Sequence, residues 1–453
     1  MTSDMTELHR QPVLFRMRRQ FLPLCLLACL FACSLPSSAQ TPQATEIPGK
    51  LFDIQKTWKI GGEGNWDYLT FDSSGSKLYI AHGPVVQVVD VNEGKLIGEV
   101  KGLHDAHEIA LDDHGQYGYV SDGESNDVKV FDRGTLEIVA EIPTGKNPRA
   151  VVFEPSSRLV FVICPMTSEE ARTSHRTGST QRNPSLDSIV KSTVTVIDAD
   201  TQKPLADLLL PGKAGFAQAD GKGVVYLNIT DRNQIAYFDA QAIESRLRKP
   251  ANSAPQNGSR PTAPRSKATQ SIAADLDETS GHSPALSAPF TVDWSDPSQP
   301  NPLHNFRLGQ SCESPRGLAV DSNNLRLFVA CDNMQMQVLD ATDGHVMATL
   351  PIGAGTDAIG YDPTRGLIYA SNGGGVGSLT IIRQHLTDSY AVIQELPTRA
   401  RAHTLAVNPV SGEVYLVTNV TGFDLTHNGG IGGLKTAALA GSFQVLVVGS
   451  LSN

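Results

Sequence analysis

The sequence predicts an all-β fold, and the first observation behind this prediction is a repeated pattern of short apolar segments. Residues 68–100, 108–142 and 317–350 each contain four such segments, separated by turns rich in Asp, Asn, Ser and Gly. The second of these copies reads EIALDDHGQYGYVSDGESNDVKVFDRGTLEIVAEI. A repeat of about 40 residues with four strands in each unit is typical of the blades of a β-propeller.

The number of blades comes from a polar residue that ends the first strand of every repeat. These markers are Asp72, Asp112, Glu154, Asp220, Asp321, Asp362 and Asn408. Two intervals between them are long, at 66 and 101 residues, and a second series of Asp residues at the ends of the third strands lengthens by the same amounts. Because both series lengthen together, the extra residues are insertions, at 165–191 and 244–288, and seven markers predict seven blades.

The N-terminal part of the chain predicts how the ring closes. The last repeat lacks a fourth strand after residues 443–448, whereas LFDIQKTWKI at residues 51–60 resembles the fourth strand of the other repeats. We expect this segment to complete the last blade, since closure removes sheet edges that would otherwise pair with other chains. The predicted fold is therefore an all-β, seven-bladed β-propeller of four-stranded antiparallel blades, closed by an N-terminal strand.

One aromatic residue occupies the same step in every second strand. These residues are Tyr79, Tyr119, Phe161, Tyr226, Phe328, Tyr369 and Tyr415. A large side chain at a constant position suits packing between neighbouring blades, so we assign these residues a structural role.

The first 39 residues have the anatomy of an export signal peptide, which leaves residues 40–453 as a single propeller domain. Arginines precede an apolar run from Phe21 to Leu35, and small residues at 37–39 offer a cleavage site. No later segment is apolar enough to cross a bilayer. We therefore expect an exported protein, periplasmic or extracellular.

Three export routes stay open. The segment RRQFL at residues 18–22 resembles the core of a twin-arginine signal, which directs the export of folded proteins, and general secretion fits the same anatomy. Cys29 and Cys33 lie in poor matches to a lipoprotein cleavage box, because bulky Leu27 and Phe31 stand where small residues are usual. A lipid anchor is the weakest of the three alternatives.

The charge of the chain argues against general binding to polyanions. The full chain has a net charge of −10, and without residues 1–39, which hold four basic and two acidic side chains, the net charge is −12. The second insertion is locally basic, with Arg246, Arg248, Lys249, Arg260, Arg265 and Lys267. Two interpretations of this stretch stay open, a solvated linker or a contact with an anion or a nucleic acid.

Three cysteines remain after the signal peptide, and two of them predict a disulfide. Cys312 precedes the first strand of a blade and Cys331 ends the second strand, so the hairpin places them close together. An oxidising compartment would join them. Cys164 ends the equivalent strand of another blade without a partner, and we expect it to be a buried, inert thiol.

Three short motifs resemble the repeat of a known family. Val-Tyr-Leu-Val-Thr-Asn at 414–419, Gly-Tyr-Val-Ser-Asp at 118–122 and Ile-Tyr-Ala-Ser-Asn at 368–372 are similar to the YVTN repeat. Without its insertions, the chain from residue 51 to 448 resembles the YncE-like, YVTN-repeat seven-bladed β-propeller proteins of the bacterial periplasm and cell surface. The resemblance implies the fold but no activity, because members of that family mostly have no assigned enzymatic role.

The best candidate site lies at the central channel, where the first strand of each blade begins. The residues five positions before the markers, together with one neighbour, are Asp67, His107, Glu108, Arg149, Gly215, Arg316, Asp357 and His403. Charged and histidine side chains at a similar height on the axis predict one of two arrangements. They form either a polar cup for a ligand or a ring of side chains that neutralise one another with the help of water.

We predict a binding or interaction scaffold without assembled catalytic machinery and without a cofactor. Its partner is an unknown protein, a peptide or a small anionic molecule, and we expect a monomer. For a small anion, the two arginines of the ring would clamp the ligand, the two histidines would hydrogen-bond to it, and the two aspartates would orient the histidines.

The alternative function is that of a metal-dependent, lactonase-like hydrolase. Its axial cation would be held by Asp67, His107, Glu108, Asp357 and His403. The arginines of the same ring would repel such a cation. The spacing of His104 and His107 in a loop is a weak metal signal.

Overall fold

The structure is a computed structural model that describes residues 50–72, 74–165, 191–247, 290–293, 302–386, 388–424 and 435–451. The expected signal peptide lies outside these residues, as do most of the two insertions. The described residues belong to one compact unit, Pro48–Asn453. No helix among them is long and apolar enough to cross a membrane.

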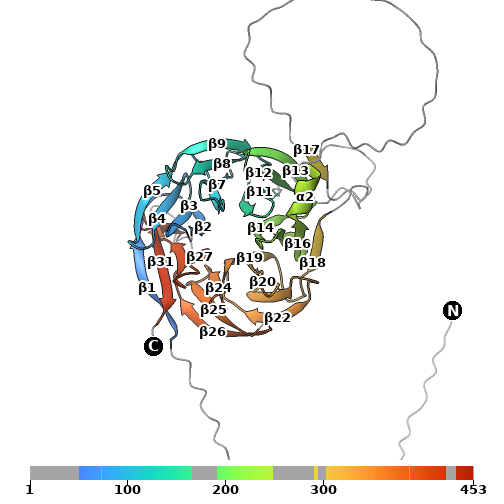
Figure 1. Cartoon of the computed structure of the whole chain (residues 1–453). Helices are drawn as coiled ribbons and strands as arrows, with labels where there is room; N and C mark the ends of the chain where they lie inside the picture. Colours follow the sequence, from blue (N-terminus) through green and yellow to red (C-terminus); the bar gives the residue numbers. More distant parts are fainter. Residues whose placement is uncertain are drawn as a thin grey trace, which may run out of the picture. The chain divides into compact units, whose positions relative to one another are not determined.

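Seven sheets stand in a ring around a central channel, as Figure 1 shows. The strands nearest the channel are β2 (Trp66–Asp72), β6 (Ala106–Leu111), β10 (Ala150–Glu154), β14 (Ala214–Ala219), β19 (Pro315–Asp321), β23 (Thr356–Asp362) and β27 (Leu405–Val407). Each of these strands contacts the next one around the ring, and β27 contacts β2, so the ring is closed. The predicted seven-bladed propeller is confirmed.

The other strands of each blade follow in order from the channel to the rim. The second strands are β3 (Lys77–His82), β7 (Tyr117–Asp122), β11 (Leu159–Cys164), β15 (Val224–Ile229), β20 (Arg326–Cys331), β24 (Leu367–Asn372) and β28 (Val414–Thr418). The third strands are β4 (Val85–Asp90), β8 (Asp127–Asp132), β12 (Lys191–Asp198), β16 (Gln234–Asp239), β21 (Gln335–Asp340), β25 (Ser378–His385) and β31 (Gln444–Ser450). The fourth strands are β5 (Lys95–Val100), β9 (Ile138–Pro143), β13 (Lys203–Pro211), β18 (His304–Arg307), β22 (Val346–Pro351), β26 (Ser389–Pro397) and β1 (Phe52–Lys59).

The polar markers at the ends of the first strands are turn formers. Asp362 is fully buried, and its Oδ1 accepts the backbone N–H groups of Thr364 at 2.9 Å and Arg365 at 3.2 Å. Glu154 and Asn408 accept N–H groups at the same two offsets. Such side chains favour tight turns because their oxygens reach the backbone two or three residues further on. The markers therefore recur because every hairpin needs an acceptor at this point.

The recurring aromatic residues pack between neighbouring blades, as predicted. All seven are at most 4% exposed. The ring centroid of Tyr79 in the first blade lies 5.8 Å from that of Phe131 in the second, and Phe161 in the third lies 5.0 Å from Phe238 in the fourth. Each pair buries two large rings at a blade boundary, so the repeat of aromatics holds the blades together.

The N-terminal strand completes the last blade. β1 pairs antiparallel with β31, from Phe52 opposite Ser450 to Lys59 opposite Gln444. The strand order of this blade is β1-β31-β28-β27, so strands from the two ends of the described chain share one sheet. The prediction of closure by residues 51–60 is confirmed.

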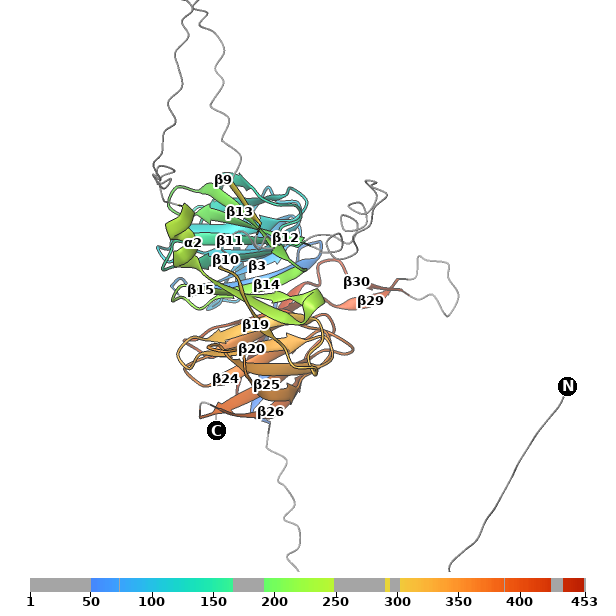
Figure 2. The ribbon, with the colours of Figure 1, turned by 90° about the vertical axis from the view of Figure 1, so that its right-hand side faces the viewer.

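Several elements depart from the predicted pattern. β17 (Phe290–Asp293) follows the second insertion and pairs in parallel with β13, which gives the third blade a fifth strand. Helix α2 (Ala240–Leu247) holds residues 244–247, the start of that insertion, and a 3-10 helix, η1 (Thr230–Arg232), precedes β16. In the last blade, β29 (Thr421–Asp424) and β30 (Lys435–Ala438) form an additional hairpin that projects from the ring (Figure 2).

Candidate binding site at the central channel

β-Bulges mark the starts of five innermost strands. In β2 the pairing advances three residues from Trp66 to Leu69 while the partner strand advances two, so one residue is extra. β6, β14, β19 and β23 contain the same irregularity at the same place. A bulge breaks the alternation of side chains between the two faces of a strand. Asp67 and its neighbour Tyr68 consequently both line the channel.

Tyr68 and Phe216 stack on each other across the channel. Their ring centroids are 4.9 Å apart and the planes differ by 27°. The hydroxyl of Tyr68 donates a hydrogen bond of 3.0 Å to the backbone carbonyl of Asp357 in the sixth blade. Burial, and then the negative charges of Asp67 and Asp357, raise the pKa of Tyr68 well above its ordinary value, so the hydroxyl keeps the proton that it donates.

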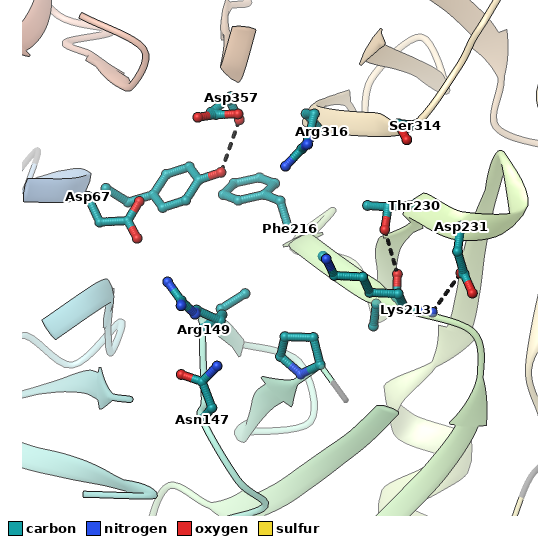
Figure 3. A pocket seen from close by; sticks show the side chains of 15 residues that line it. Asp67, Asn147, Arg149, Lys213, Phe216, Thr230, Asp231, Ser314, Arg316 and Asp357 are labelled. Carbon is teal, nitrogen blue, oxygen red and sulfur yellow. Dashed lines mark hydrogen bonds between the residues drawn. The ribbon is translucent and has the colours of Figure 1, made fainter. Parts of the chain in front are cut away.

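A cavity of about 660 Å³ opens beside this stack (Figure 3). Its charged lining residues are Asp67, Arg149, Lys213, Asp231, Arg316 and Asp357, and the two stacked rings form part of its apolar lining. The volume is within the range that small-molecule sites occupy. Of the seven charged or histidine residues predicted for the site, four therefore line one cavity, whereas His107, Glu108 and His403 do not line it.

His107 lies between two carboxylates. Its Nδ1 is 2.8 Å from Oδ2 of Asp67, and its Nε2 is 2.9 Å from Oδ2 of Asp105. The Nη1 atom of Arg149 is also 3.2 Å from Nδ1. Because a guanidinium only donates, Nδ1 either donates to Asp67 or accepts from Arg149, and the shorter contact favours Asp67. His107 thus holds the carboxylate of Asp67 in place.

His403 holds Asp357 in a similar way at the boundary between the sixth and seventh blades. Its Nδ1 is 3.0 Å from Oδ2 of Asp357, and the backbone N–H of Asp357 donates to the carbonyl oxygen of His403 at 3.3 Å. The side chain of Asp357 remains 40% exposed. The structure therefore brings each predicted histidine to a predicted aspartate, and both aspartates still reach the cavity.

Glu108 is buried in the wall between the second and third blades. Its Oε2 accepts the backbone N–H of Val151 at 3.1 Å. Burial, which outweighs that hydrogen bond, and the negative charge of Asp67 raise the pKa of Glu108 well above its ordinary value. This carboxyl group is a buried structural acid, and it does not face the cavity.

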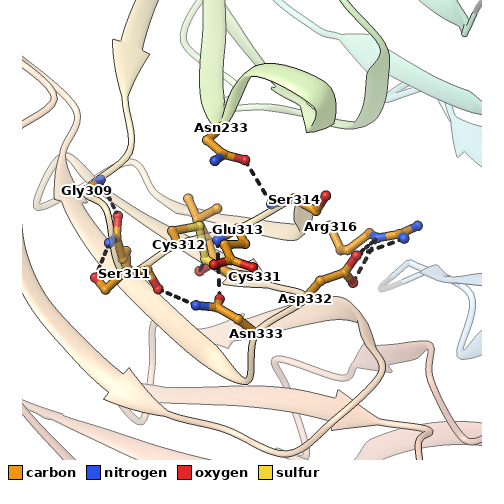
Figure 4. The surroundings of a disulfide bond; sticks show 12 residues. Asn233, Gly309, Ser311, Cys312, Glu313, Ser314, Arg316, Cys331, Asp332 and Asn333 are labelled. Atoms are coloured by element: carbon orange, nitrogen blue, oxygen red, sulfur yellow. Dashed lines mark hydrogen bonds and ion pairs between the residues drawn. A yellow bond between two sulfur atoms is a disulfide. The ribbon is translucent and has the colours of Figure 1, made fainter. Parts of the chain in front are cut away.

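Arg316 faces the cavity but already has a carboxylate partner. Its Nε and Nη2 contact both carboxylate oxygens of Asp332 at 2.9–3.1 Å, a two-pronged arrangement. The predicted disulfide between Cys312 and Cys331 lies beside this pair, with Cα atoms 5.2 Å apart (Figure 4). Since Asp332 directly follows Cys331, the disulfide helps to place the carboxylate that holds Arg316.

Arg149 and Lys213 have no carboxylate within ion-pair distance in the part of the chain that the structure describes. Lys213 precedes β14, and its backbone N–H donates to Oδ1 of Asp231 at 2.7 Å. Its side chain lines the cavity (Figure 3). Sequence reasoning missed Lys213 because it lies two positions before the axis position of its blade, which is Gly215.

Side-chain hydroxyl and amide groups of the second strands hold the axis residues in place. The side chains of Ser121, Asn228 and Ser371 donate to the backbone carbonyls of Arg149, Arg316 and His403, each in the next blade. All three donors follow the recurring aromatic residue by two positions. The polar residue two positions after the recurring aromatic therefore links these blades and helps to set the height of the channel side chains.

The described residues do not form the ligand set that the alternative function, a metal-dependent hydrolase, requires. No group of three or more His, Cys, Asp and Glu side chains that could hold a metal ion occurs among the described residues.

Ser125, His104 and Asp122 form a cluster of the residue types found in a catalytic triad. His104 contacts Asp122 at 3.3 Å and Ser125 at 2.8 Å, but both contacts use Nδ1. A relay from carboxylate through histidine to a nucleophile needs both ring nitrogens, so this cluster is not a catalytic triad.

Cys164 is free and buried, as predicted. Burial raises the pKa of its thiol to about 12. A thiol in that state is a poor nucleophile, because the thiolate is the reactive form.

Comparisons with known proteins show the fold and nothing finer. No family model and no curated protein sequence matches the chain. The WD40 repeats of RRP9 share 8% sequence identity over 88% of this chain and 97% of that chain, with a TM-score of 0.55. Hydrazine synthase of Kuenenia stuttgartiensis shares 15% over 89% and 99%, with a TM-score of 0.51. A chain in the mitotic checkpoint complex shares 11% over 87% and 96%, with a TM-score of 0.53.

Identities this low show a shared architecture only. The three matches are different proteins from one another, so the likeness carries no ligand or partner across to this chain. Function must be argued from the channel cavity itself.

Proposed function

We propose that the protein is an exported binding scaffold that recognises an anionic group at the channel cavity. The observation that carries this proposal is the pair of cationic side chains, Arg149 and Lys213, which line the cavity without a carboxylate partner among the described residues. Cationic donors in a partly enclosed cavity bind carboxylates and phosphates more strongly than they do on an open surface. The anion belongs to a small molecule, a peptide or a protein.

The assignment of the two arginines changes in one respect. Arg149 stays a primary anion contact, but Arg316 is held by Asp332 and has less to offer a ligand. Lys213 takes its place as the second contact. An ammonium group works as a point charge and accepts many approach directions, whereas Arg149 can present two parallel N–H groups.

Export rests on two independent features. The first 39 residues have the anatomy of a signal peptide. The disulfide between Cys312 and Cys331 is typical of proteins that mature outside the cytoplasm. Both features agree with the resemblance to the YncE-like, YVTN-repeat proteins of the bacterial periplasm and cell surface, and we include that relationship in the proposal.

The test is a titration of the mature protein with a panel of anions by calorimetry and thermal shift. The panel contains acetate, benzoate, succinate and phosphate at up to millimolar concentration. At least one anion should bind saturably, and the double substitution Arg149→Met with Lys213→Met should abolish its binding. Lys203→Met, at an exposed position at the start of β13, is the matched control and should bind like the parent.

Two results would overturn the proposal. One is the absence of binding for every anion in the panel and for anionic peptides. The other is binding that survives loss of both cationic side chains, since the anion would then occupy another site.

A further inference from the structure

Two side chains of opposite charge, Lys213 and Asp357, line the same cavity from different blades. Arg149 and Lys213 precede the inner strands of the third and fourth blades, whereas Asp357 and Asp67 belong to the sixth and first. In Figure 3, Lys213 and Asp357 lie on opposite sides of Phe216. Within the described chain, no ion pair joins either cation to either carboxylate.

The two aspartates lack a direct ion pair with a described lysine or arginine, and Arg316 acts on Asp357 only over a longer distance. Each aspartate is contacted by one histidine, and neither forms an ion pair with a described Lys or Arg side chain. Arg316 does not fill this role, because both oxygens of Asp332 already hold its guanidinium. Opposite charges that face one cavity without touching attract a ligand that carries both signs, and partial enclosure strengthens that attraction over its value in water.

The stacked rings of Tyr68 and Phe216 contribute a flat apolar surface to the same cavity. Flat apolar groups gain both from the area that they bury on such a surface and from offset ring contacts. The middle of the ligand is therefore expected to be flat and uncharged, with its charged groups at the two ends.

We infer that the cavity takes a small zwitterion with a flat apolar body. Its carboxylate contacts Arg149 and Lys213, its body lies on the Tyr68–Phe216 stack, and its ammonium group contacts Asp357. This inference rests on the proposed function, because the same two cations hold the anionic end. It adds a second charged contact and the shape of the ligand.

The experiment compares three probes that differ in one charged group. Para-aminomethylbenzoate carries both charges, para-toluate has a methyl group in place of the aminomethyl group, and benzylamine carries only the ammonium group. Calorimetry on the full mature protein should give an affinity for the zwitterion at least about tenfold above that for para-toluate, equivalent to about 1.4 kcal/mol. Benzylamine should bind most weakly of the three.

Substitutions in the cavity test which side chain contacts each charged end of the ligand. Asp357→Asn should remove the preference for the zwitterion and leave the affinity for para-toluate within about twofold, since the lost contact is with the ammonium group alone. Arg149→Met should weaken both ligands. Asp343→Asn, in an exposed turn, is the matched control and should bind like the parent protein. If Asp357→Asn unfolds, Asp357→Glu serves instead, because it keeps the charge and should keep the preference.

The outcomes separate this inference from the proposed function. Equal affinity for the zwitterion and para-toluate would overturn the zwitterion and leave anion binding in place. A preference that survives Asp357→Asn would overturn the assignment of the ammonium end. A panel in which no anion binds would remove the proposed function and this inference together.

Discussion

The ring of Tyr68 lies on the ring of Phe216, although the two residues come from the first and fourth blades of the propeller. The hydroxyl of Tyr68 then reaches the backbone of Asp357 in the sixth blade. One side chain therefore connects three blades that do not adjoin one another, and it does so inside the channel. The stack forms part of the apolar lining of the candidate site.

Two substitutions of Tyr68 should separate the contribution of its ring stack to stability from that of its hydrogen bond. Tyr68→Phe keeps the stack and loses one hydrogen bond, so it should lower the free energy of unfolding by about 1 kcal/mol. Tyr68→Ala also loses the ring and leaves a void, and should lower it by about 3 kcal/mol. Denaturant unfolding measures both, with Tyr117→Phe near the surface as a control that should change little. Equal loss in the two variants would contradict a stabilising role for the stack.

Glu108→Gln should stabilise the protein in a manner that depends on pH. Burial raises the pKa of Glu108 in the folded state, so folding favours its protonated form. The stability of the parent protein therefore falls as pH rises from the ordinary pKa of 4.5 towards the folded pKa, and the loss stays constant above it. Glutamine cannot ionise and keeps an acceptor for Val151, so the variant avoids that loss.

The predicted gain of Glu108→Gln is near zero below pH 4.5 and grows by up to about 1.4 kcal/mol for each pH unit between the two pKa values. Unfolding in urea at acidic and neutral pH measures it. Glu63→Gln, an exposed position in a loop, is the control. A gain that is equal at both pH values would show that ionisation of Glu108 is not its cause.

Loss of the disulfide should affect both stability and the site. Replacing Cys312 and Cys331 by alanine opens a loop with a sequence separation of 19, which should cost about 3 kcal/mol of stability. The ion pair of Arg316 with Asp332 should also loosen. Both sulfur atoms are buried, so a mild reductant should leave the folded parent oxidised, which mass spectrometry after thiol alkylation measures. Rapid reduction without unfolding would contradict the buried position.

The sequence could predict what each blade repeats, because repeated features answer the same local need seven times. Turn acceptors such as Asp362, interblade rings such as Tyr79, and the closing strand at residues 51–60 all follow from alternation, hairpin chemistry and edge protection. The disulfide followed from the hairpin as well. These features require only neighbours in one blade or in adjacent blades.

The site was predictable only in part, because its geometry depends on departures from the repeat. A bulge turns Tyr68 into the channel beside Asp67, whereas strict alternation would place only one of them there. Lys213 reaches the cavity from the loop before β14 and not from a strand position. The partner of Arg316 is Asp332, and no spacing rule within one strand pairs these two residues. Each case depends on a bulge, a loop position or a side-chain contact that the repeat does not encode.

The turn markers offer a direct test of their structural role. Asp362→Ala removes the acceptor for Thr364 and Arg365 and leaves two N–H groups without it, so it should lower stability by about 1–2 kcal/mol. Asp362→Asn keeps an acceptor oxygen, as Asn408 does naturally in the last blade, and should recover most of that loss. Thermal unfolding compares the two variants. An asparagine variant as unstable as the alanine variant would indicate that the charge, through Arg365, matters more than the turn.

The pairing of β1 with β31 has a consequence for the order in which the protein is made. Residues 52–59 leave the ribosome before the other blade strands, yet their partner strand, residues 444–450, is synthesised after all of them. The first strand must therefore wait, unpaired, while every blade between them forms. Contacts of such long sequence separation form slowly, because the chain loses much freedom before it gains them. A nascent ring stays open until its final strand arrives, and translation itself sets the earliest moment at which the circle can close.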